Sequence, residues 1–225
     1  MKPVCPPKNL PLFPETVISS RQDPLFYEGL ARQGGYGLIA GVDEAGRGPL
    51  AGPVVAAAVI IPEYCELDGV RDSKQMTEQA REKAFPRISK QVLTSGIAVV
   101  PHTYIDEHNI LKATLRAMKL AVSALDPQPE FLLVDGIHSI GLSIPQRCIK
   151  KGDQRSLSIA AASVMAKVYR DRIMRSYHKF CPAYSFDKNK GYGTSEHLRA
   201  LEIYGPSPFH RLTFKRVLGH DQRET

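Results

Sequence analysis

One stretch of this chain, residues 38–61, constrains the fold more than any other. An apolar run over residues 38–42 ends in two adjacent carboxylates, Asp43 and Glu44, and a second apolar run covers residues 53–61. The segment between the runs is rich in glycine, with Gly46, Gly48 and Gly52. Two strand-like runs joined by such a segment predict a β-hairpin. Glycine also lets a ligand approach the peptide amides closely, so an acid pair beside this turn indicates a binding or catalytic site.

The length and composition indicate one main domain. A chain of 225 residues, of which 43% are hydrophobic, can bury a sizeable core. Residues 1–35 are proline-rich at first and then mildly helical from Asp23 onward. We expect them to form an N-terminal extension, and we expect residues 36–225 to form the single main domain.

The sequence contains no signal for a membrane. No apolar run approaches the roughly 18 residues that a membrane span requires, and residues 1–14 hold five prolines in place of the apolar segment of an export signal. We therefore expect no membrane partner and a cytoplasmic location, where the four cysteines would be free thiols. We also expect a monomer.

The charge of the chain is unevenly distributed. The net charge is +7, but residues 1–112 hold 12 Lys and Arg against 13 Asp and Glu, whereas residues 113–225 hold 18 against 10. A basic half indicates a polyanionic partner, with nucleic acid first among the candidates. A solvated basic surface without a partner is the alternative that charge alone leaves open.

Two later acids repeat the pattern of the first pair. Asp135 follows the apolar run 131–134, and Asp153 follows a short apolar stretch ending at Ile149. Open sheets place their sites at the carboxyl ends of strands. Asp153 precedes a long predicted helix over residues 156–180, so it could instead be the helix N-cap, the interpretation that its local sequence alone favours.

The remaining helices and strands follow from apolar spacing and capping residues. Residues 96–101 predict a strand, and residues 104–125 predict one long helix with an apolar stripe. Thr77 is a candidate N-cap for a helix that starts at Glu78. Either Thr194 or Ser195 could cap a short helix near the C-terminus.

A further set of side chains forms weaker candidates for binding. Lys74, in a loop before a helix, could contact a phosphate, although such a lysine is more often solvated. One face of the helix over 156–180 is polar and basic, with Ser156, Ser163, Lys167 and Arg170. Asp171 is expected to pair with Lys167 or Arg175 one turn away. Tyr192 lies between two glycines and has an open face, while the histidines are expected to be structural or solvated: His138, His178, His197 and His210.

The four acids suggest a specific chemistry. Asp43, Glu44, Asp135 and Asp153, if brought together by a sheet, would repel one another strongly. Divalent cations relieve that repulsion, and Mg²⁺ and Mn²⁺ prefer oxygen ligands. Two such ions about 3.5–4 Å apart can hold and hydrolyse a phosphodiester.

The chain resembles the ribonuclease HII family over roughly residues 38–216. The matching motifs occur in the order of the family: Gly-Val-Asp-Glu-Ala-Gly-Arg-Gly-Pro at 41–49, Asp-Ser-Lys at 72–74, Asn-Ile at 109–110, Val-Asp-Gly at 134–136, Lys-Gly-Asp at 151–153, Ser-Ile-Ala-Ala-Ala-Ser-Val-Met-Ala-Lys-Val-Tyr-Arg-Asp at 158–171, Gly-Tyr-Gly-Thr at 191–194 and Pro-Phe-His-Arg at 208–211. The first motif and the long helical motif are highly specific. Gly-Arg-Gly after the acid pair favours type HII over the sister type HIII.

The resemblance implies an α/β, ribonuclease H-like fold with a central mixed sheet flanked by helices, which would occupy residues 36–225 as the catalytic domain. It implies an endonuclease that hydrolyses the RNA strand of RNA·DNA hybrids and nicks duplex DNA 5′ to embedded ribonucleotides. By motif, the catalytic and metal-binding acids are Asp43, Glu44, Asp135 and Asp153, with Mn²⁺ or Mg²⁺ as cofactor, two ions per site. Gly46, Arg47 and Gly48 would sense the 2′-hydroxyl, and Tyr192 would stack on the neighbouring sugar. Lys74, Ser163 and Lys167 are the weaker candidates for phosphate contact.

Two other functions remain open from the residues alone. A different metal-dependent nuclease on the same fold, such as a Holliday-junction resolvase or an integrase-like core, would cleave without regard to ribose. A non-catalytic nucleic-acid-binding module would use the acids only as strand caps and would show no metal-dependent turnover. A nucleotide site at the glycine-rich turn is weaker, because the phosphate-binding motif with its lysine is absent from the sequence.

Overall fold

The computed structural model describes residues 23–65, 67, 69–70, 73 and 76–218. Most of the predicted N-terminal extension and the candidate Lys74 therefore lie outside the described residues. Three cysteines fall within them, and all three are free thiols, as predicted: Cys65, Cys148 and Cys181.

A mixed sheet of five strands forms the centre of the molecule. In spatial order the strands are β3 (Thr94–Val100), β2 (Val54–Ile60), β1 (Ile39–Ala45), β4 (Phe131–Asp135) and β5 (Gln146–Ile149). The β1–β2 and β2–β3 pairs are antiparallel, and the β1–β4 and β4–β5 pairs are parallel. The predicted hairpin and the predicted mixed sheet are both confirmed, and β1 lies in the middle of the sheet.

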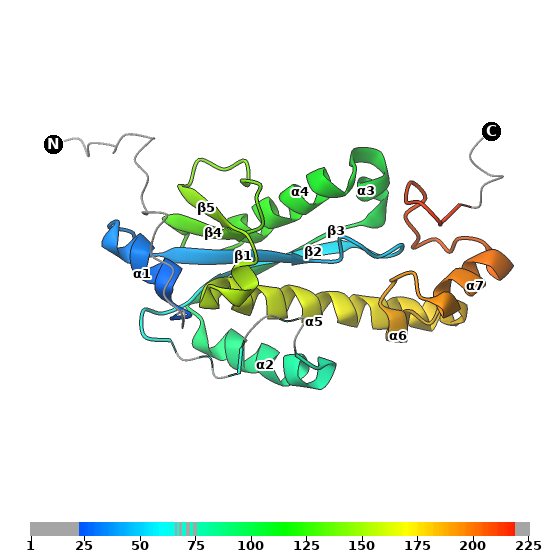
Figure 1. The fold of residues 1–225 in the computed structure, drawn as a ribbon, viewed down its shortest axis with the longest axis horizontal. Coiled ribbons are helices and arrows are strands. Elements are labelled where there is room, and N and C mark those ends of the chain that lie inside the picture. The colour runs from blue at the N-terminus through cyan, green and yellow to red at the C-terminus, as the bar shows by residue number, and fades with distance from the viewer. Residues whose placement is uncertain (1–22, 66, 68, 71–72, 74–75, 219–225) are drawn as a thin grey trace.

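Helices cover both faces of this sheet (Figure 1). Strand β2 is buried along its whole length, and its alternate residues pack into two different cores. One core is closed by α4 (Ile110–Ser123), and the other by α5 (Leu157–Phe180) together with α2 (Glu78–Gln91). A strand buried on both faces requires side chains that pack closely, which accounts for the alanines and valines of β2.

Helix α5 crosses β1 at Gly41, and the two backbones lie so close there that position 41 has no room for a side chain. A Cβ atom placed on Gly41 would lie 2.1 Å from the carbonyl carbon of Ser158. The small residues at the start of α5 and this glycine therefore form one close crossing, and the face of β1 that carries Gly41 is the face that α5 covers.

Strand β1 is longer than the sequence predicted. The apolar run was expected to end before the acid pair, but β1 continues to Ala45 and includes both acids. Asp43 pairs with Ala57 of β2 and Glu44 pairs with Ala56. The ladder to β2 holds these residues extended in spite of their low strand propensity.

The single helix predicted over residues 104–125 is wrong in one respect. The structure has two helices, α3 (His102–His108) and α4, separated at Asn109, whose φ is 75°. A positive φ combined with an extended ψ of 164° is rare for a residue other than glycine, and the Asn109 side chain accepts a hydrogen bond from the Lys112 amide at 3.1 Å. The break therefore ends one helix and caps the next. The predicted caps Thr77 and Thr194 are confirmed at the starts of α2 and α7.

The first helix, α1 (Phe26–Gln33), supports the start of α5. It begins three residues later than predicted, because Asp23 and Pro24 form a turn closed by the Phe26 amide. The buried Glu28 accepts hydrogen bonds from the Ser158 amide at 2.9 Å and from the hydroxyls of Ser156 and Ser158, each at 2.6 Å. A carboxylate at a helix N-terminus also interacts favourably with the helix dipole. The division of the chain at residue 35 stays a prediction.

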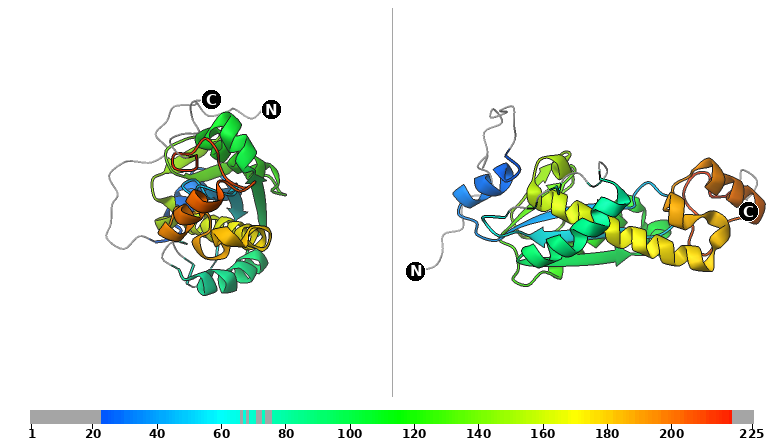
Figure 2. Two further views of the ribbon diagram at one scale, coloured as in Figure 1. Left: turned by 90° about the vertical axis from the view of Figure 1, so that its right-hand side faces the viewer. Right: turned by 90° about the horizontal axis from the view of Figure 1, so that it is seen from below.

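The C-terminal part of the chain packs against the far end of α5, which extends beyond the sheet (Figure 2). It contains η2 (Pro182–Tyr184), α6 (Phe186–Asn189) and α7 (Ser195–Tyr204). A further 3₁₀ helix, η1 (Gly152–Gln154), precedes α5. A separate apolar cluster joins this part to the turn between β1 and β2 through Leu50, Ala51 and Met174. The two segments thus lie together although they are about 150 residues apart in the sequence.

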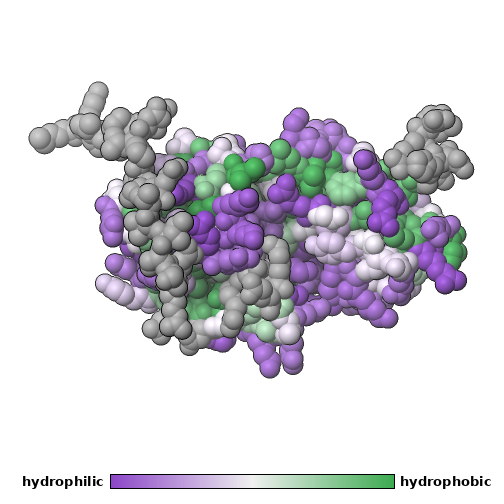
Figure 3. Space-filling view, viewed as in Figure 1, coloured by the Kyte–Doolittle hydropathy of each residue, from purple (hydrophilic) through white to green (hydrophobic). Residues whose placement is uncertain are grey.

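Hydrophilic residues cover much of the face seen in Figure 1, with separate hydrophobic areas between them (Figure 3). None of the helices in the described part of the chain has the length and apolar character needed to cross a membrane.

The contacts of Glu28 lead to a prediction about stability. We expect Glu28→Ala to lower the free energy of unfolding by roughly 2–4 kcal/mol, because buried donors at the start of α5 lose their acceptor. Chemical denaturation followed by circular dichroism measures the change. The exposed Glu202 on α7 provides the control, since Glu202→Gln should shift stability by less than about 0.5 kcal/mol. Equal stability of the two variants would show that α1 is not needed to support α5.

Candidate active site

The sheet places Asp43 and Asp135 side by side. Strands β1 and β4 are parallel with Val42 opposite Val134, so the next residue on each strand is an acid at the same edge of the sheet. Val42 and Val134 both face the core closed by α4. Strand alternation directs Asp43 and Asp135 to the opposite face, the one covered by α5. The sequence predicted that these two acids lie close together, and the register of the β1–β4 pair places them there.

Asp43 lies in an environment that disfavours its charged form. Its side chain is buried, with the residue only 3% exposed. Burial raises the pKa of Asp43 well above its usual value, and repulsion from Glu44 and Asp135 raises it further. Hydrogen bonds from the Ser163 hydroxyl and from the Glu44 amide, at 2.7 Å, act in the opposite direction. The repulsion shows that three of the four predicted acids lie near one another.

Asp153 is brought to the same edge by a tight turn after β5. Lys151 adopts a left-handed conformation with φ of 55°, and the next amide, that of Gly152, donates a hydrogen bond to Asp135 Oδ1 at 2.6 Å. Asp153 follows directly and is buried. The interpretation of Asp153 as the N-cap of α5 is wrong, because Ser156 takes that position and accepts a hydrogen bond from the Ile159 amide at 3.3 Å.

The acid group offers the donor atoms that a hard divalent cation requires. All candidate ligands are carboxylate oxygens, and the raised pKa of Asp43 shows that burial and the neighbouring acids disfavour its ionised form, a cost that a cation would relieve. Within the residues that the structure describes, no three acid, histidine or cysteine side chains are arranged to hold a metal ion by themselves. Mg²⁺ is commonly bound by one or two carboxylates together with water and substrate phosphates. The donor set therefore fits an ion whose coordination the substrate completes.

Two buried arginines hold the glycine-rich turn that follows the acid pair. Arg211 donates to the carbonyl oxygens of Gly46, Arg47 and Gly52 at 2.6, 3.0 and 3.0 Å. Arg170 donates to those of Ala51, Pro53 and Lys190 at 3.1, 3.0 and 2.9 Å. Burial lowers the pKa of Arg170 to about 10 and that of Arg211 to about 9, so both groups stay charged at neutral pH.

Arg170 explains why the turn needs glycine at one particular position. Gly46 has a φ of +102°, and a Cβ atom there would lie 2.1 Å from Arg170 Nε. Gly48 is different, since a Cβ atom would meet only Tyr192 Cε1 at 3.6 Å, an ordinary contact. The turn therefore lies directly against Tyr192, whose side chain is exposed. Three predicted site residues, Gly46, Gly48 and Tyr192, thus share one small region. Arg47 between the glycines lies 3.4 Å from Glu44 in an ion pair.

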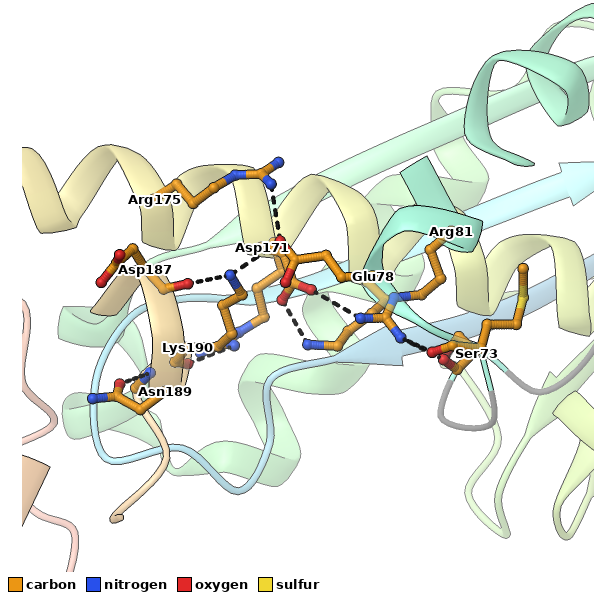
Figure 4. Close-up of polar contacts among 12 residues, drawn as sticks. Ser73, Glu78, Arg81, Asp171, Arg175, Asp187, Asn189 and Lys190 are labelled. Atoms are coloured by element: carbon orange, nitrogen blue, oxygen red, sulfur yellow. Dashed lines mark hydrogen bonds and ion pairs between the residues drawn. The ribbon is translucent and has the colours of Figure 1, made fainter. Parts of the chain in front are cut away.

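The two candidates on α5 have partners within the protein. The Ser163 hydroxyl lies 2.8 Å from that of Ser73 and also bonds Asp43. Lys167 Nζ lies 2.6 Å from Asp171, which confirms the predicted ion pair one turn away. Asp171 also meets Arg81 of α2 at 3.5 Å, and Arg81 donates to the carbonyl oxygen of Ser73 at 2.8 Å (Figure 4).

The same region links α2 to the segment before Tyr192. Glu78 of α2 accepts hydrogen bonds from Arg175 at 2.9 Å and from Lys190 at 3.2 Å (Figure 4). Lys190 is buried, and its carbonyl oxygen is an acceptor for Arg170. The supporting residues Ser73, Arg81 and Arg211 were not predicted as part of the site. Ser73 and Arg211 lie within two of the matched motifs, but their contacts with Ser163 and with the glycine-rich turn join segments that are distant in the sequence.

The two glycines of the turn provide a matched pair for a test. We expect Gly46→Ala to lower the free energy of unfolding by roughly 2–4 kcal/mol, because it combines a positive φ with a collision against Arg170. Gly48→Ala should change it by less than about 1 kcal/mol. Urea denaturation of both variants measures the difference. Similar stabilities would mean that Arg170 does not fix the turn.

Known proteins of one family are similar to this chain over most of its length. Residues 40–217 match the family profile described as Ribonuclease HII. A ribonuclease HII from Geobacter metallireducens is 52% identical over 212 residues, which cover 94% of this chain and 98% of that protein. A ribonuclease HII from Bacillus subtilis is 53% identical over 191 residues, covering 85% of this chain and 74% of the relative.

Solved structures agree in fold. The ribonuclease H2 from Pyrococcus horikoshii superposes with a TM-score of 0.69 at 27% identity, covering 80% of this chain and 95% of that one. Bst-RNase HIII, solved in complex with Mn²⁺, has a TM-score of 0.61 at 20% identity and covers 80% of this chain and 68% of that one. The family profile spans the acid group and the glycine-rich turn, and the chain therefore belongs to the ribonuclease HII family and is a type HII ribonuclease H, a hydrolase of phosphodiester bonds.

Proposed function

We propose that this endonuclease cuts the RNA strand of RNA·DNA hybrids and nicks duplex DNA on the 5′ side of an embedded ribonucleotide. One observation carries the proposal: the acid group of Asp43 and Glu44 continues directly into the turn that lies against Tyr192. The acids that cleave the phosphodiester and the turn that contacts the adjoining sugar would then be separated by only a few residues.

We assign the hydrolytic centre to Asp43, Glu44, Asp135 and Asp153, with Mg²⁺ or Mn²⁺ as cofactor and two ions per site. Such ions, when bound, would activate a water molecule for attack and stabilise the charge on the leaving oxygen. The chain itself supplies the negative charge that attracts them, and the Glu44 and Gly152 amides hold one oxygen each of Asp43 and Asp135. The Mn²⁺ in the structure of Bst-RNase HIII supports a divalent cofactor.

The reading of the sugar is assigned to Gly46, Arg47, Gly48 and Tyr192. A 2′-hydroxyl both donates and accepts hydrogen bonds, and it is the group that distinguishes RNA from DNA. Arg211 binds the carbonyl oxygens of Gly46 and Arg47, so we propose that the turn reads the hydroxyl through its amides. The exposed ring of Tyr192 would stack on the adjacent sugar.

The assignments to phosphate contact are weaker. Lys74 lies outside the described residues and stays a prediction. Ser163 and Lys167 also stay predictions, and each already has a partner in the protein. A phosphate would have to share Lys167 with Asp171. The predicted monomeric state and cytoplasmic location stay predictions as well.

A cleavage assay tests the proposed function directly. The substrate is a DNA duplex with one ribonucleotide, compared with an all-DNA duplex of the same sequence, each with Mg²⁺, Mn²⁺ or EDTA. We expect a metal-dependent nick 5′ to the ribonucleotide and an intact all-DNA control. Cleavage of both duplexes would remove the sugar-reading role and favour a general metal-dependent nuclease. Folded protein that binds duplex without any cleavage would favour a binding module.

The acid group gives a second prediction that separates catalysis from stability. We expect Asp43→Asn and Asp135→Asn each to abolish turnover while duplex binding is retained. Because Asp43 is destabilised by burial and by its acidic neighbours, the neutral amide in Asp43→Asn should leave the melting temperature unchanged or higher. Single-turnover cleavage and thermal unfolding monitored by circular dichroism measure both effects. A large fall in melting temperature in Asp43→Asn, with none in the control Glu202→Gln, would instead make Asp43 a structural residue.

A further inference from the structure

Two histidines that the hydrolytic chemistry does not use meet in the interior. His197 of α7 and His210 are 0% and 1% exposed, and their Nε2 atoms lie 2.8 Å apart. His197 Nδ1 lies 2.9 Å from the carbonyl oxygen of Tyr192. On the other side, His210 Nδ1 lies 2.9 Å from the Ser207 amide and 2.8 Å from the Ser207 hydroxyl. The rings thus form a continuous chain of contacts from Ser207 to Tyr192.

The direction of these hydrogen bonds follows from their two ends. A backbone amide only donates, so His210 Nδ1 accepts from Ser207 and the neutral ring carries its proton on Nε2. That proton is donated to His197 Nε2, which leaves the proton of His197 on Nδ1. Only there can it be donated to the Tyr192 carbonyl oxygen, which is an acceptor. The two histidines therefore hold opposite tautomers.

The surroundings of the pair favour the neutral rings that this arrangement needs. The aromatic rings of Tyr184 and Phe186 pack against both imidazoles. Burial lowers the pKa of His210 to about 4 and also lowers the pKa of His197. Both rings are thus neutral at physiological pH.

The chain of hydrogen bonds ends at the residue that lies against the glycine-rich turn. The Tyr192 ring is 46% exposed, and a Cβ atom on Gly48 would meet Tyr192 Cε1 at 3.6 Å. The next residue after His210 is Arg211, which holds the carbonyl oxygens of Gly46 and Arg47. One short segment, residues 207–211, therefore holds the turn directly and Tyr192 through the histidine pair.

We propose that His197 and His210 are positioning residues, whose directional hydrogen bonds fix Tyr192 relative to the Gly46–Gly48 turn and thereby set the preference for a ribonucleotide. The inference rests on the proposed function, in which Tyr192 and this turn contact the sugar. An apolar pair of similar size could fill the same space, but it would leave the Tyr192 carbonyl group without this donor. The directional chain is what distinguishes a positioning role from core packing.

The tautomers provide the first test. Long-range ¹⁵N–¹H correlation spectra of histidine-labelled protein at pH 7 distinguish a proton on Nδ1 from one on Nε2. We expect His197 to carry its proton on Nδ1 and His210 on Nε2. A His197 ring protonated on Nε2 would overturn the proposal, because that ring could not donate to Tyr192.

Two substitutions at position 197 separate the two ends of the ring. In His197→Asn the side-chain amide lies near the former Nδ1 position and can still donate to Tyr192, whereas in His197→Gln it reaches toward the former Nε2 position. The measured quantity is the affinity for a duplex that contains one ribonucleotide divided by the affinity for the all-DNA duplex. Both affinities are measured in EDTA, so that binding is followed without cleavage. We expect His197→Gln to reduce this ratio about tenfold, toward the ratio of Tyr192→Ala. His197→Asn should keep the ratio within about twofold of the wild-type value.

A variant in the same aromatic cluster controls for a general loss of stability. Tyr184→Phe removes the hydrogen bond from the Tyr184 hydroxyl to the Gly205 carbonyl oxygen, at 2.7 Å, without touching the histidine chain. It should lower the melting temperature and leave the affinity ratio unchanged. A ratio that falls equally in Tyr184→Phe and His197→Gln would overturn the positioning role. Where His197→Gln does not fold, His210→Asn breaks the same chain and takes its place.

The outcomes also separate this inference from the proposed function. A wild-type protein that binds both duplexes equally would overturn the proposed sugar reading, and with it the purpose of the histidine pair, whatever the tautomers. A wild-type preference that survives both His197→Gln and His210→Asn would overturn the inference alone.

Discussion

The site depends on two buried guanidinium groups whose partners are almost all backbone carbonyl groups. Arg170 and Arg211 make seven hydrogen bonds to carbonyl oxygens, six of which lie between Gly46 and Pro53. Removing the partners of a buried charge is strongly unfavourable, by roughly 3–5 kcal/mol. The turn cannot relax without leaving these charges unsatisfied. Its shape is therefore set before any substrate arrives, and the absence of a side chain at Gly46 is a consequence of where Arg170 must lie.

A few residues before the turn, the acid group brings carboxyl groups together, whereas positively charged arginines hold the turn itself. Asp43 lies buried beside Glu44 and Asp135, and the combination raises its pKa. Folding therefore buries a carboxyl group beside other carboxyl groups at the end of β1, and two guanidinium groups beneath the turn that follows. Neither arrangement is one that stability alone would favour. In the proposed function, a divalent cation would balance the acids, and the phosphates of a nucleic-acid strand would be attracted to the arginines beneath the turn.

Parts of this structure followed from local sequence, and others could not. The hairpin, the strand before Asp135 and the caps Thr77 and Thr194 were predictable because each depends on neighbouring residues. The break at Asn109 was missed because the apolar stripe continues across it, while one backbone angle changes the direction of the chain. The part that Arg170 and Arg211 play in holding the turn could not be assigned, since their partners in the turn lie more than a hundred residues away. A buried arginine and a solvated one look the same in sequence.

A rigid turn is the physical basis on which sugar discrimination could rest. A site built to bond a hydroxyl rejects a substrate without it, because the buried polar groups of the site are then left unpaired. That penalty exists only if the site cannot close over the missing atom. Arg211 fixes the turn from below, and the histidine pair holds Tyr192 on its other side. In the function proposed for this chain, ribose specificity then arises from the groups that prevent movement as much as from those that contact the sugar. In that function the acids and their ions carry out cleavage, so we interpret the large buried polar network around residues 170, 197, 210 and 211 as a support for recognition.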